Sequence, residues 1–310
     1  MHGNAIVVPE AAAPSRQSTV ISSVSTVARA MRPAQWLKNG IVFAGLVFGG
    51  KLLEPTAVAS ATLTALTFCL LSSGFYLLND VRDRDADRLH PVKRLRPVPA
   101  GELAPRTAVF AGTILIVSAI AGSAFLGRDL ALVFLAYASL MAAYNLGLKE
   151  VVIVDVFAIA AGFVLRAVGG AIAVSVSISP WLLMCTMLLA LLIGFGKRRH
   201  ELVALDNAAE HRRNLNLYNR PMLDQAVAVT AAGTLIAYAV YTFDSESAQY
   251  HHRMMLTIPI VAYSVFRYLY LLYHRGQGGA PETMLLTDRP LLASVAAWGA
   301  ASAFLFYFAG

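Results

Sequence analysis

The chain has 310 residues, of which 57% are hydrophobic and only 14% are charged, and its formal net charge is +7. Soluble domains carry about 25% charged residues, so this composition excludes an ordinary soluble enzyme and indicates a membrane protein. The basic residues gather in loops between apolar segments, which is typical of membrane topology, so no nucleic-acid partner is expected.

The apolar segments are each long enough to cross a bilayer, which takes roughly 20 residues. We therefore expect an all-α membrane protein with about nine transmembrane helices in a single domain, residues 29–310. Residues 1–28 are predicted to form a mobile N-terminal tail, because they lack the basic start and compact apolar core of a signal peptide. The expected spans are 36–53, 56–78, 107–125, 130–148, 151–174, 181–195, 225–243, 254–272 and 290–308.

The basic residues also predict the orientation of the chain. All but five of the 25 lie in the N-terminal segment or in the loops that follow the second, fourth, sixth and eighth spans. Lys51, Arg128 and Arg253 fall on the opposite side, and Arg166 and Arg267 lie inside spans. By the positive-inside rule, the N-terminus and the basic loops are cytoplasmic in a multi-pass protein of the cell inner (plasma) membrane. Such a basic surface attracts membrane lipids and phosphates.

An acidic cluster stands at the end of the second apolar segment. Residues 57–78 carry no charge, and four aspartates then follow within nine positions. On a helix that continued through this stretch, four oxygen-bearing residues would share one face: Tyr76, Asn79 or Asp80, Asp83 and Asp87. Mg²⁺ prefers such oxygen ligands and commonly keeps substrate phosphates as others. The alternative is an acidic helix end paired with neighbouring arginines.

Two basic segments accompany this cluster. The loop 90–101 holds Lys93, Arg94 and Arg96 among too many prolines for a helix. It either covers a phosphate group or contacts lipid headgroups, and its position directly after the aspartates favours the phosphate. After the sixth span, Lys197 and Glu201 are spaced for one helix face, as an ordinary ion pair worth about 0.2–0.5 kcal/mol or as part of a site.

A third polar group lies around the fourth and fifth spans. Tyr144 and Lys149 mark the turn between them, and Arg166 lies about 22 Å along the helix that starts near Val151. An unpaired guanidinium at that depth costs a few kcal/mol or more, so Arg166 must face a protein interior or a wet cavity. A structural role and a substrate contact both remain open. Arg267 lies nearer the cytoplasmic end of its span, where its head can reach water.

The acidic cluster carries a family resemblance. Asn79, Asp80, Asp83 and Asp87 fit an N-D-x-x-D-x-x-x-D pattern after the second of nine helices, and the chain resembles the UbiA-type intramembrane prenyltransferase superfamily. The resemblance implies a ring of helices around a central cavity with a cytoplasmic polar mouth. It also implies an isoprenyl diphosphate substrate bound through Mg²⁺, which two aspartate motifs hold.

The second aspartate motif is replaced here by the segment from Lys197 to Glu201. With this change the chain resembles one branch of the superfamily, the decaprenyl-phosphate phosphoribosyltransferases of arabinan-making actinobacteria. Further similarities are segments 32–39, 79–83, 90–94, 147–149, 196–198 and 281–289. The branch implies phosphoribosyl diphosphate (PRPP) as donor and polyprenyl (decaprenyl) phosphate as acceptor, in a step toward the arabinan donor of the cell wall. It also allows a homo-oligomer such as a trimer.

From this resemblance and the spacing we expect Asp83, Asn79 and Lys197 to act in catalysis, with Asn79, Asp83 and Asp87 as Mg²⁺ ligands. The expected substrate-binding residues are Lys38, Tyr76, Asp80, Lys93, Arg94, Arg96, Tyr144, Lys149, Arg166, Arg198, Glu201 and Arg267. Two alternatives are a conventional prenyltransferase with an aromatic or lipid acceptor and a secondary transporter. A transporter predicts acidic groups near mid-membrane, whereas here they gather at one mouth.

Overall fold

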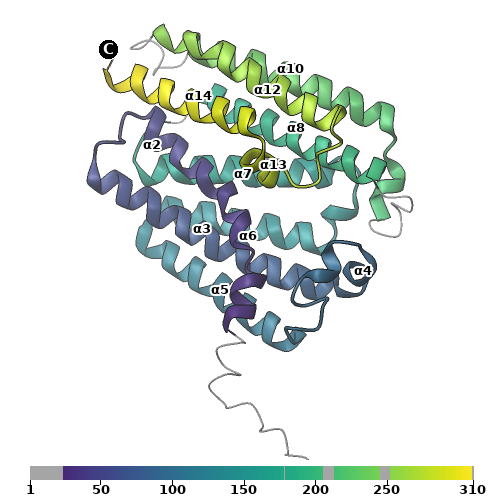
Figure 1. Ribbon diagram of the computed structural model, residues 1–310. Helices are drawn as coiled ribbons and strands as arrows, with labels where there is room; N and C mark the ends of the chain where they lie inside the picture. Colours follow the sequence, from purple (N-terminus) through teal and green to yellow (C-terminus); the bar gives the residue numbers. More distant parts are fainter. Residues whose placement is uncertain (1–23, 178, 205–212, 245–251, 309–310) are drawn as a thin grey trace, which may run out of the picture.

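The computed structural model describes residues 24–177, 179–204, 213–244 and 252–308, and within these ranges the chain forms helices and no strand (Figure 1). The longer α-helices are α3 (Pro55–Arg82), α5 (Pro105–Leu126), α6 (Arg128–Leu146), α7 (Val154–Ala173), α8 (Pro180–Ala204), α10 (Arg220–Asp244), α12 (Ile258–Tyr273) and α14 (Arg289–Phe308). The short elements are η1 (Pro33–Phe43), α2 (Ala44–Phe48), α4 (Arg84–Leu89), η2 (Lys93–Leu95), η3 (Leu148–Glu150), η4 (Arg213–Leu217), η5 (His252–Thr257) and α13 (Pro281–Thr287).

The expectation of an all-α membrane protein is confirmed. Seven helices among the described residues are long and apolar enough to cross a membrane. The last expected span corresponds to α14, but the first is a 3₁₀ helix, η1, followed by the short α2 rather than one continuous α-helix. The number of transmembrane spans, about nine, therefore stays a prediction. Of the tail expected at 1–28, residues 24–28 belong to a helical stretch, and the rest lies outside the described residues.

Local sequence accounts for several helix boundaries. Pro55, Pro105 and Pro281 open α3, α5 and α13, where the missing amide hydrogen costs nothing because the first helical N–H groups have no partner. Gly127 separates α5 from α6 with a φ of 119°, a backbone conformation that favours glycine. These boundaries set the lengths of the helices that carry the polar residues.

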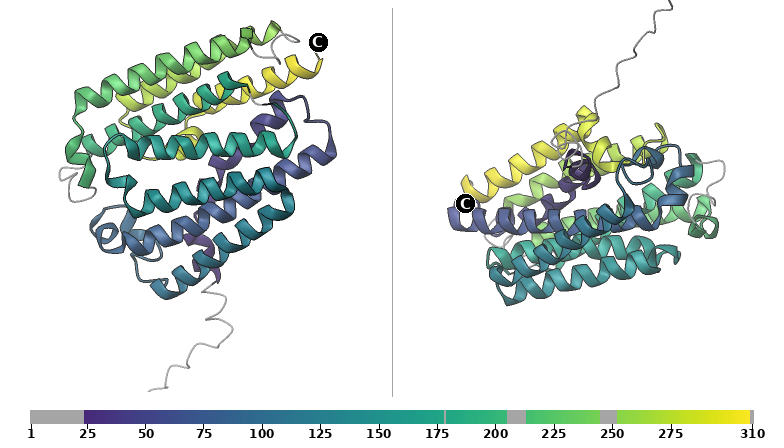
Figure 2. Two further views of the ribbon diagram at one scale, coloured as in Figure 1. Left: turned by 180° about the vertical axis from the view of Figure 1, so that it is seen from behind. Right: turned by 90° about the horizontal axis from the view of Figure 1, so that it is seen from below.

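The helices form two packed groups. Helices α3, α5, α6 and α7 lie side by side around one core, and α8, α10, α12 and α14 gather on the other flank of α7 (Figures 1 and 2). The segment η1 packs against both α3 and α7. This crossing depends on Gly170, because a Cβ added there would lie 2.0 Å from the carbonyl oxygen of Val42.

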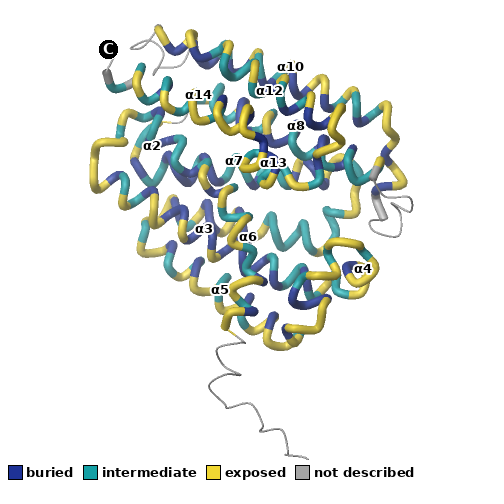
Figure 3. The backbone as a smooth tube through the Cα atoms, viewed as in Figure 1, coloured by how far each residue is buried: buried dark blue, intermediate teal, exposed yellow. Residues whose placement is uncertain are grey.

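Polar loops gather at one end of the bundle. The α4 segment and the end of α8 lie at this end, whereas the α2–α3 connection and the C-terminus lie at the other (Figure 1). Many residues around α4 are exposed, in contrast to the buried middle of α3 (Figure 3). The acidic segment and the basic segment of α8 therefore lie at the same end of the bundle.

Candidate active site

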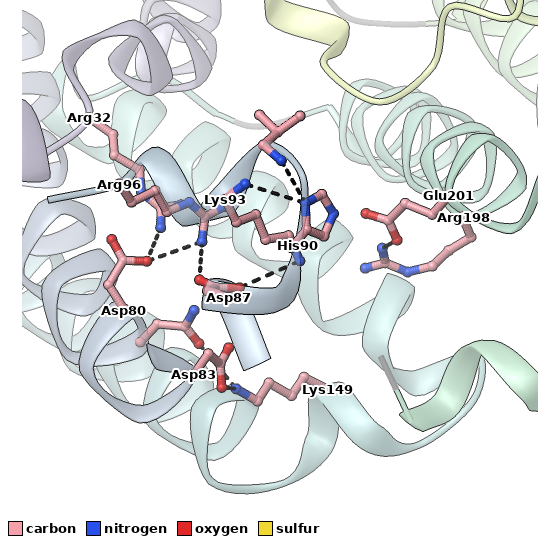
Figure 4. A network of polar contacts seen from close by, with 12 residues as sticks. Arg32, Asp80, Asp83, Asp87, His90, Lys93, Arg96, Lys149, Arg198 and Glu201 are labelled. Atoms are coloured by element: carbon pink, nitrogen blue, oxygen red, sulfur yellow. Dashed lines mark hydrogen bonds and ion pairs between the residues drawn. The ribbon is translucent and has the colours of Figure 1, made fainter. Parts of the chain in front are cut away.

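The acidic motif begins where α3 ends. The helix stops at Arg82, Asp83 takes a non-helical φ and ψ of −91° and 6°, and α4 then starts at Arg84. The expectation of one uninterrupted helix is therefore wrong. Lys149 from η3 donates hydrogen bonds to Asp83 Oδ1 at 2.5 Å and to Asn79 Oδ1 at 3.3 Å (Figure 4). Two of the predicted metal-ligand oxygens thus converge on one cationic atom.

The remaining aspartates of the motif face arginines. Asp80 is fully buried and accepts hydrogen bonds from Arg32 and from Arg96 Nη1, the latter at 3.1 Å. The same Arg96 nitrogen lies 2.7 Å from Asp87 Oδ2, and Lys93 Nζ lies 3.8 Å from Asp87 Oδ1 (Figure 4). Asp87 therefore does not share the Lys149 contact of Asp83, because the helix break turns it toward the 90–101 loop.

A cavity adjoins this network. It has a volume of about 220 Å³ and is lined in part by Arg32, Gln35, Asp80 and Arg96. Asp80 Oδ2 and Arg32 Nε are buried without a hydrogen-bond partner. Arg32 also has a φ of 56°, which is uncommon for a residue other than glycine and is a feature that clusters at functional sites. Its guanidinium lies 5.0 Å from the centre of the Tyr76 ring.

A second charged group forms where η1, α8 and α13 meet. Lys38 Nζ lies 3.8 Å from Glu282 Oε2, and the Gln35 amide donates a hydrogen bond to Glu282 Oε1. Lys197 lies close enough for its charge to interact with those of Lys38 and Glu282. Burial alone would raise the pKa of the Glu282 carboxyl, but Lys38, the Gln35 amide and Lys197 hold that pKa below its ordinary value. Glu282 is therefore ionised at neutral pH.

Arg198 serves a different purpose from its neighbour Lys197. Its side chain is only 2% exposed, and it donates hydrogen bonds to Asp155 Oδ2 at 2.7 Å and to Glu201 Oε2 at 2.5 Å. The Tyr218 hydroxyl donates to the other Asp155 oxygen at 2.7 Å. Glu201 therefore forms its short contact with Arg198 (Figure 4), while its charge also acts on the expected partner, Lys197. This network joins α7 and α8 to the connection between η4 and α10.

Arg166 lies in the interior of the bundle, as its depth predicted. It donates hydrogen bonds to Asn39 Oδ1 at 2.6 Å, to the Gly162 carbonyl at 2.9 Å and to the Tyr137 hydroxyl at 2.6 Å. The faces of Tyr137 and Phe163 lie against its guanidinium at 4.7 and 5.4 Å. Neutral acceptors satisfy its hydrogen bonds and aromatic rings contact its guanidinium, so its positive charge is not neutralised and acts on Lys38.

The last three predicted residues lie at different places. Arg267 makes a two-point pair with Asp288, with hydrogen bonds of 3.0 and 2.8 Å. Arg94 is exposed on its loop, and Tyr144 lies near the charges of Lys38 and Arg198. Arg267 therefore links α12 to the start of α14, and it belongs to neither of the two charged groups above.

Sequence reasoning missed three members of the site. Arg32, Gln35 and Glu282 had no predicted role, although all three lie in segments that carried the family resemblance. Gln35 and Glu282 are 247 positions apart in the chain, so no local spacing could pair them. Only the packing of α13 against η1 brings them together.

The residues at the acidic motif suit a hard divalent cation. Asn79 and Asp83 present two oxygens to one point, which the Lys149 ammonium occupies here, and amide and carboxylate oxygens are ligands that Mg²⁺ accepts. Asp87 lies one turn further on, with its amide 2.8 Å from the Asp83 carbonyl. The described residues contain no group of three acidic, histidine or cysteine side chains arranged as a metal site.

Comparison with known proteins gives the class of this membrane protein. Residues 40–287 match the UbiA prenyltransferase family, and the chain belongs to that family. A solved UbiA homolog from Archaeoglobus fulgidus bound to GPP and Mg²⁺ has the same fold, with a TM-score of 0.70 at 19% identity over 91% of this chain and 96% of its own. The same homolog bound to DMAPP and Mg²⁺ gives a TM-score of 0.72 at 18% identity, over 91% of this chain and 99% of its own.

Curated relatives narrow the class further. The decaprenyl-phosphate phosphoribosyltransferase of Mycolicibacterium smegmatis is 32% identical over 293 residues, 89% of this chain and 90% of the relative. The protein of that name from Mycobacterium tuberculosis is 33% identical over 294 residues, 91% of this chain and 95% of the relative. The similarity to this branch thus extends over most of both chains.

Proposed function

We propose that the protein transfers the 5-phosphoribosyl group of PRPP to decaprenyl phosphate or a similar polyprenyl phosphate, and that diphosphate is released. The relatives named decaprenyl-phosphate phosphoribosyltransferase, which are 32% and 33% identical to this chain, support the proposal. The observation that carries it is the basic group that Lys197, in place of a second acidic motif near the end of α8, forms with Lys38 of η1. A donor with phosphate at both ends requires such a basic group beside the acidic one.

The chemistry requires few catalytic groups. An oxygen of the lipid phosphate attacks C1 of the ribosyl ring, the bond from C1 to the diphosphate oxygen breaks, and the electron pair leaves with diphosphate. The nucleophile is already an anion, so no general base is needed, and in-line displacement inverts C1. The protein therefore contributes positioning and stabilisation of the leaving charge.

The charged side chains divide this work. In this proposal Lys149, which contacts Asp83, and Lys93 and Arg96, which contact Asp87, bind and orient the diphosphate end. Lys197 and Lys38 bind the other phosphate, and Arg166 adds positive potential deeper in the bundle. We propose that Asn79, Asp83 and Asp87 hold Mg²⁺, which when bound neutralises charge on the diphosphate.

The proposal includes location. The enzyme lies in the plasma membrane with this site at the cytoplasmic face, because PRPP is a soluble donor and the basic loops around the site follow the positive-inside rule. Exposed apolar side chains on α3 and α5, such as Leu63, Leu66 and Phe110, would then meet lipid. The polyprenyl tail would lie along such apolar surfaces.

The direct test supplies purified protein with PRPP, Mg²⁺ and decaprenyl phosphate, with mass spectrometry of the lipid product. Formation of phosphoribosyl lipid and diphosphate is the expected result. A protein that makes no such lipid but joins a prenyl diphosphate to an aromatic acid would instead be a conventional prenyltransferase. Protection of the protein against heat by PRPP, and not by prenyl diphosphate, separates the same two functions.

A further inference from the structure

A carboxylate stands between the two phosphate-binding groups. Gln35 lines the 220 Å³ cavity together with Arg32 and Asp80, and its amide also holds Glu282 Oε1. On its other side, Glu282 Oε2 lies 3.8 Å from Lys38 Nζ. Glu282 therefore connects the neighbourhood of the acidic motif to the basic group at Lys38 and Lys197.

One carboxylate oxygen of Glu282 accepts no hydrogen bond. Its Oε2 atom is buried and has no hydrogen-bond donor, since the Lys38 ammonium is too distant for more than an ion pair. Leaving a buried charged acceptor without a donor is costly, so such an atom points to a donor that arrives with a ligand. The Gln35 amide fixes the other oxygen and thereby the direction of the carboxylate.

The charge of Glu282 excludes a phosphate as that ligand group. A carboxylate repels phosphates, and placing one beside Lys38 and Lys197 weakens a site that needs positive charge. Its useful partner must be a neutral hydrogen-bond donor. In a donor with phosphates at C1 and C5, the part that lies between the two phosphate groups is the sugar ring, and its free donors are the 2- and 3-hydroxyls.

We propose that Glu282 accepts a hydrogen bond from a ribosyl hydroxyl of the donor and so makes the enzyme selective for ribosyl over deoxyribosyl donors. This inference rests on the proposed function and assigns to that site a residue that recognises the sugar. Gln35 acts as its positioning residue.

The test compares PRPP with its 2-deoxy and 3-deoxy analogues in the full-length enzyme with Mg²⁺ and decaprenyl phosphate. The wild type should prefer PRPP over at least one deoxy donor by about 10- to 100-fold in kcat/KM, the value of a hydrogen bond to a charged group. In Glu282→Ala that preference should disappear, because PRPP falls to the level of the deoxy donor while the deoxy donor changes little. Glu282→Gln keeps the shape of the side chain and should lose part of the preference.

Glu54→Gln is the matched control, because Glu54 is an exposed carboxylate outside both charged groups and pairs with Lys51. It should leave the donor preference unchanged. If Glu282 only pairs with Lys38, its variants will slow all three donors equally, and that result overturns the inference while PRPP transfer stands. An unselective wild type overturns it as well. A wild type that transfers nothing from PRPP overturns the proposed function itself.

Discussion

Lys149 Nζ lies 2.5 Å from Asp83 Oδ1 and 3.3 Å from Asn79 Oδ1, so one ammonium bridges two residues of the acidic motif. The contact joins the end of α3 to the turn between α6 and α7, across 66 positions of sequence. The motif thus presents two of its oxygens to one cationic group. A metal ion or donor that binds to Asn79 and Asp83 must therefore either contact the Lys149 ammonium or displace it.

Removal of the Asp83 carboxylate should abolish Mg²⁺-dependent turnover. We expect Asp83→Ala to lower kcat by at least about 100-fold, because transition-state charge stabilisation depends on the groups that hold the leaving diphosphate. Asp85→Ala is the control, since the Asp85 side chain is 81% exposed and pairs only with nearby arginines. Rates measured across a Mg²⁺ titration decide the matter, and an Asp83 variant with wild-type rates would remove the site model.

Lys197 and Arg198 are neighbours with separable roles. Lys197→Ala should raise the KM for PRPP and leave thermal unfolding in detergent nearly unchanged, because burial and the nearby cations Lys38 and Arg198 offset the attraction of its charge to neighbouring carboxylates. Arg198→Ala should instead cost about 3–5 kcal/mol of stability, since it strands the buried Asp155 carboxylate. KM and melting temperature measured for both variants test the contrast. Equal melting temperatures would show that the Arg198 network is not structural.

The crossing of η1 over α7 is sensitive to one methyl group. Gly170→Ala should destabilise the protein by about 1–3 kcal/mol, because its Cβ would meet the Val42 backbone and the two segments would have to separate. Gly122→Ala is matched to it, since Gly122 is also helical but its Cβ would meet no atom within 4 Å. Thermal unfolding should distinguish the two. Equal stability would mean that η1 can move away from α7 at little cost.

The Arg267–Asp288 pair should give stability a dependence on acid. Hydrogen bonds from Arg267 hold the pKa of the Asp288 carboxyl below its ordinary value. A pKa lowered by folding stabilises the folded state above the unfolded pKa, about 3.9 for aspartate, and this contribution disappears as the pH falls through the folded value. Asp288→Asn keeps an acceptor for the Leu291 amide but removes the charge. Melting temperatures from pH 7 downward should therefore fall less steeply for this variant than for the wild type.

The class of protein and the charged residues near the ends of two of its helices could be predicted from the sequence. Membrane spans can be recognised in the sequence as apolar segments, because the thickness of the bilayer sets the minimum length of a spanning helix. The aspartates at the end of α3 and the lysine and arginine near the end of α8 were found for a similar reason, since charged residues next to an apolar span are costly and easily recognised in the sequence. The first span was less predictable, because apolar composition does not distinguish a 3₁₀ helix followed by a short α-helix from a continuous one.

Only the tertiary structure decided which charged side chains pair with one another. Helical periodicity placed Asp83 and Asp87 on one face, but the break at Asp83 sends one to Lys149 and the other to Arg96. Spacing paired Glu201 with Lys197, whereas in the fold Glu201 also forms an ion pair with Arg198, which Asp155 holds in the interior. Glu282 meets Gln35 only because α13 packs on η1. The sequence by itself determined which groups bear charge and at which end they lie, because these are local properties, whereas partner choice depends on long-range packing and was settled by the fold.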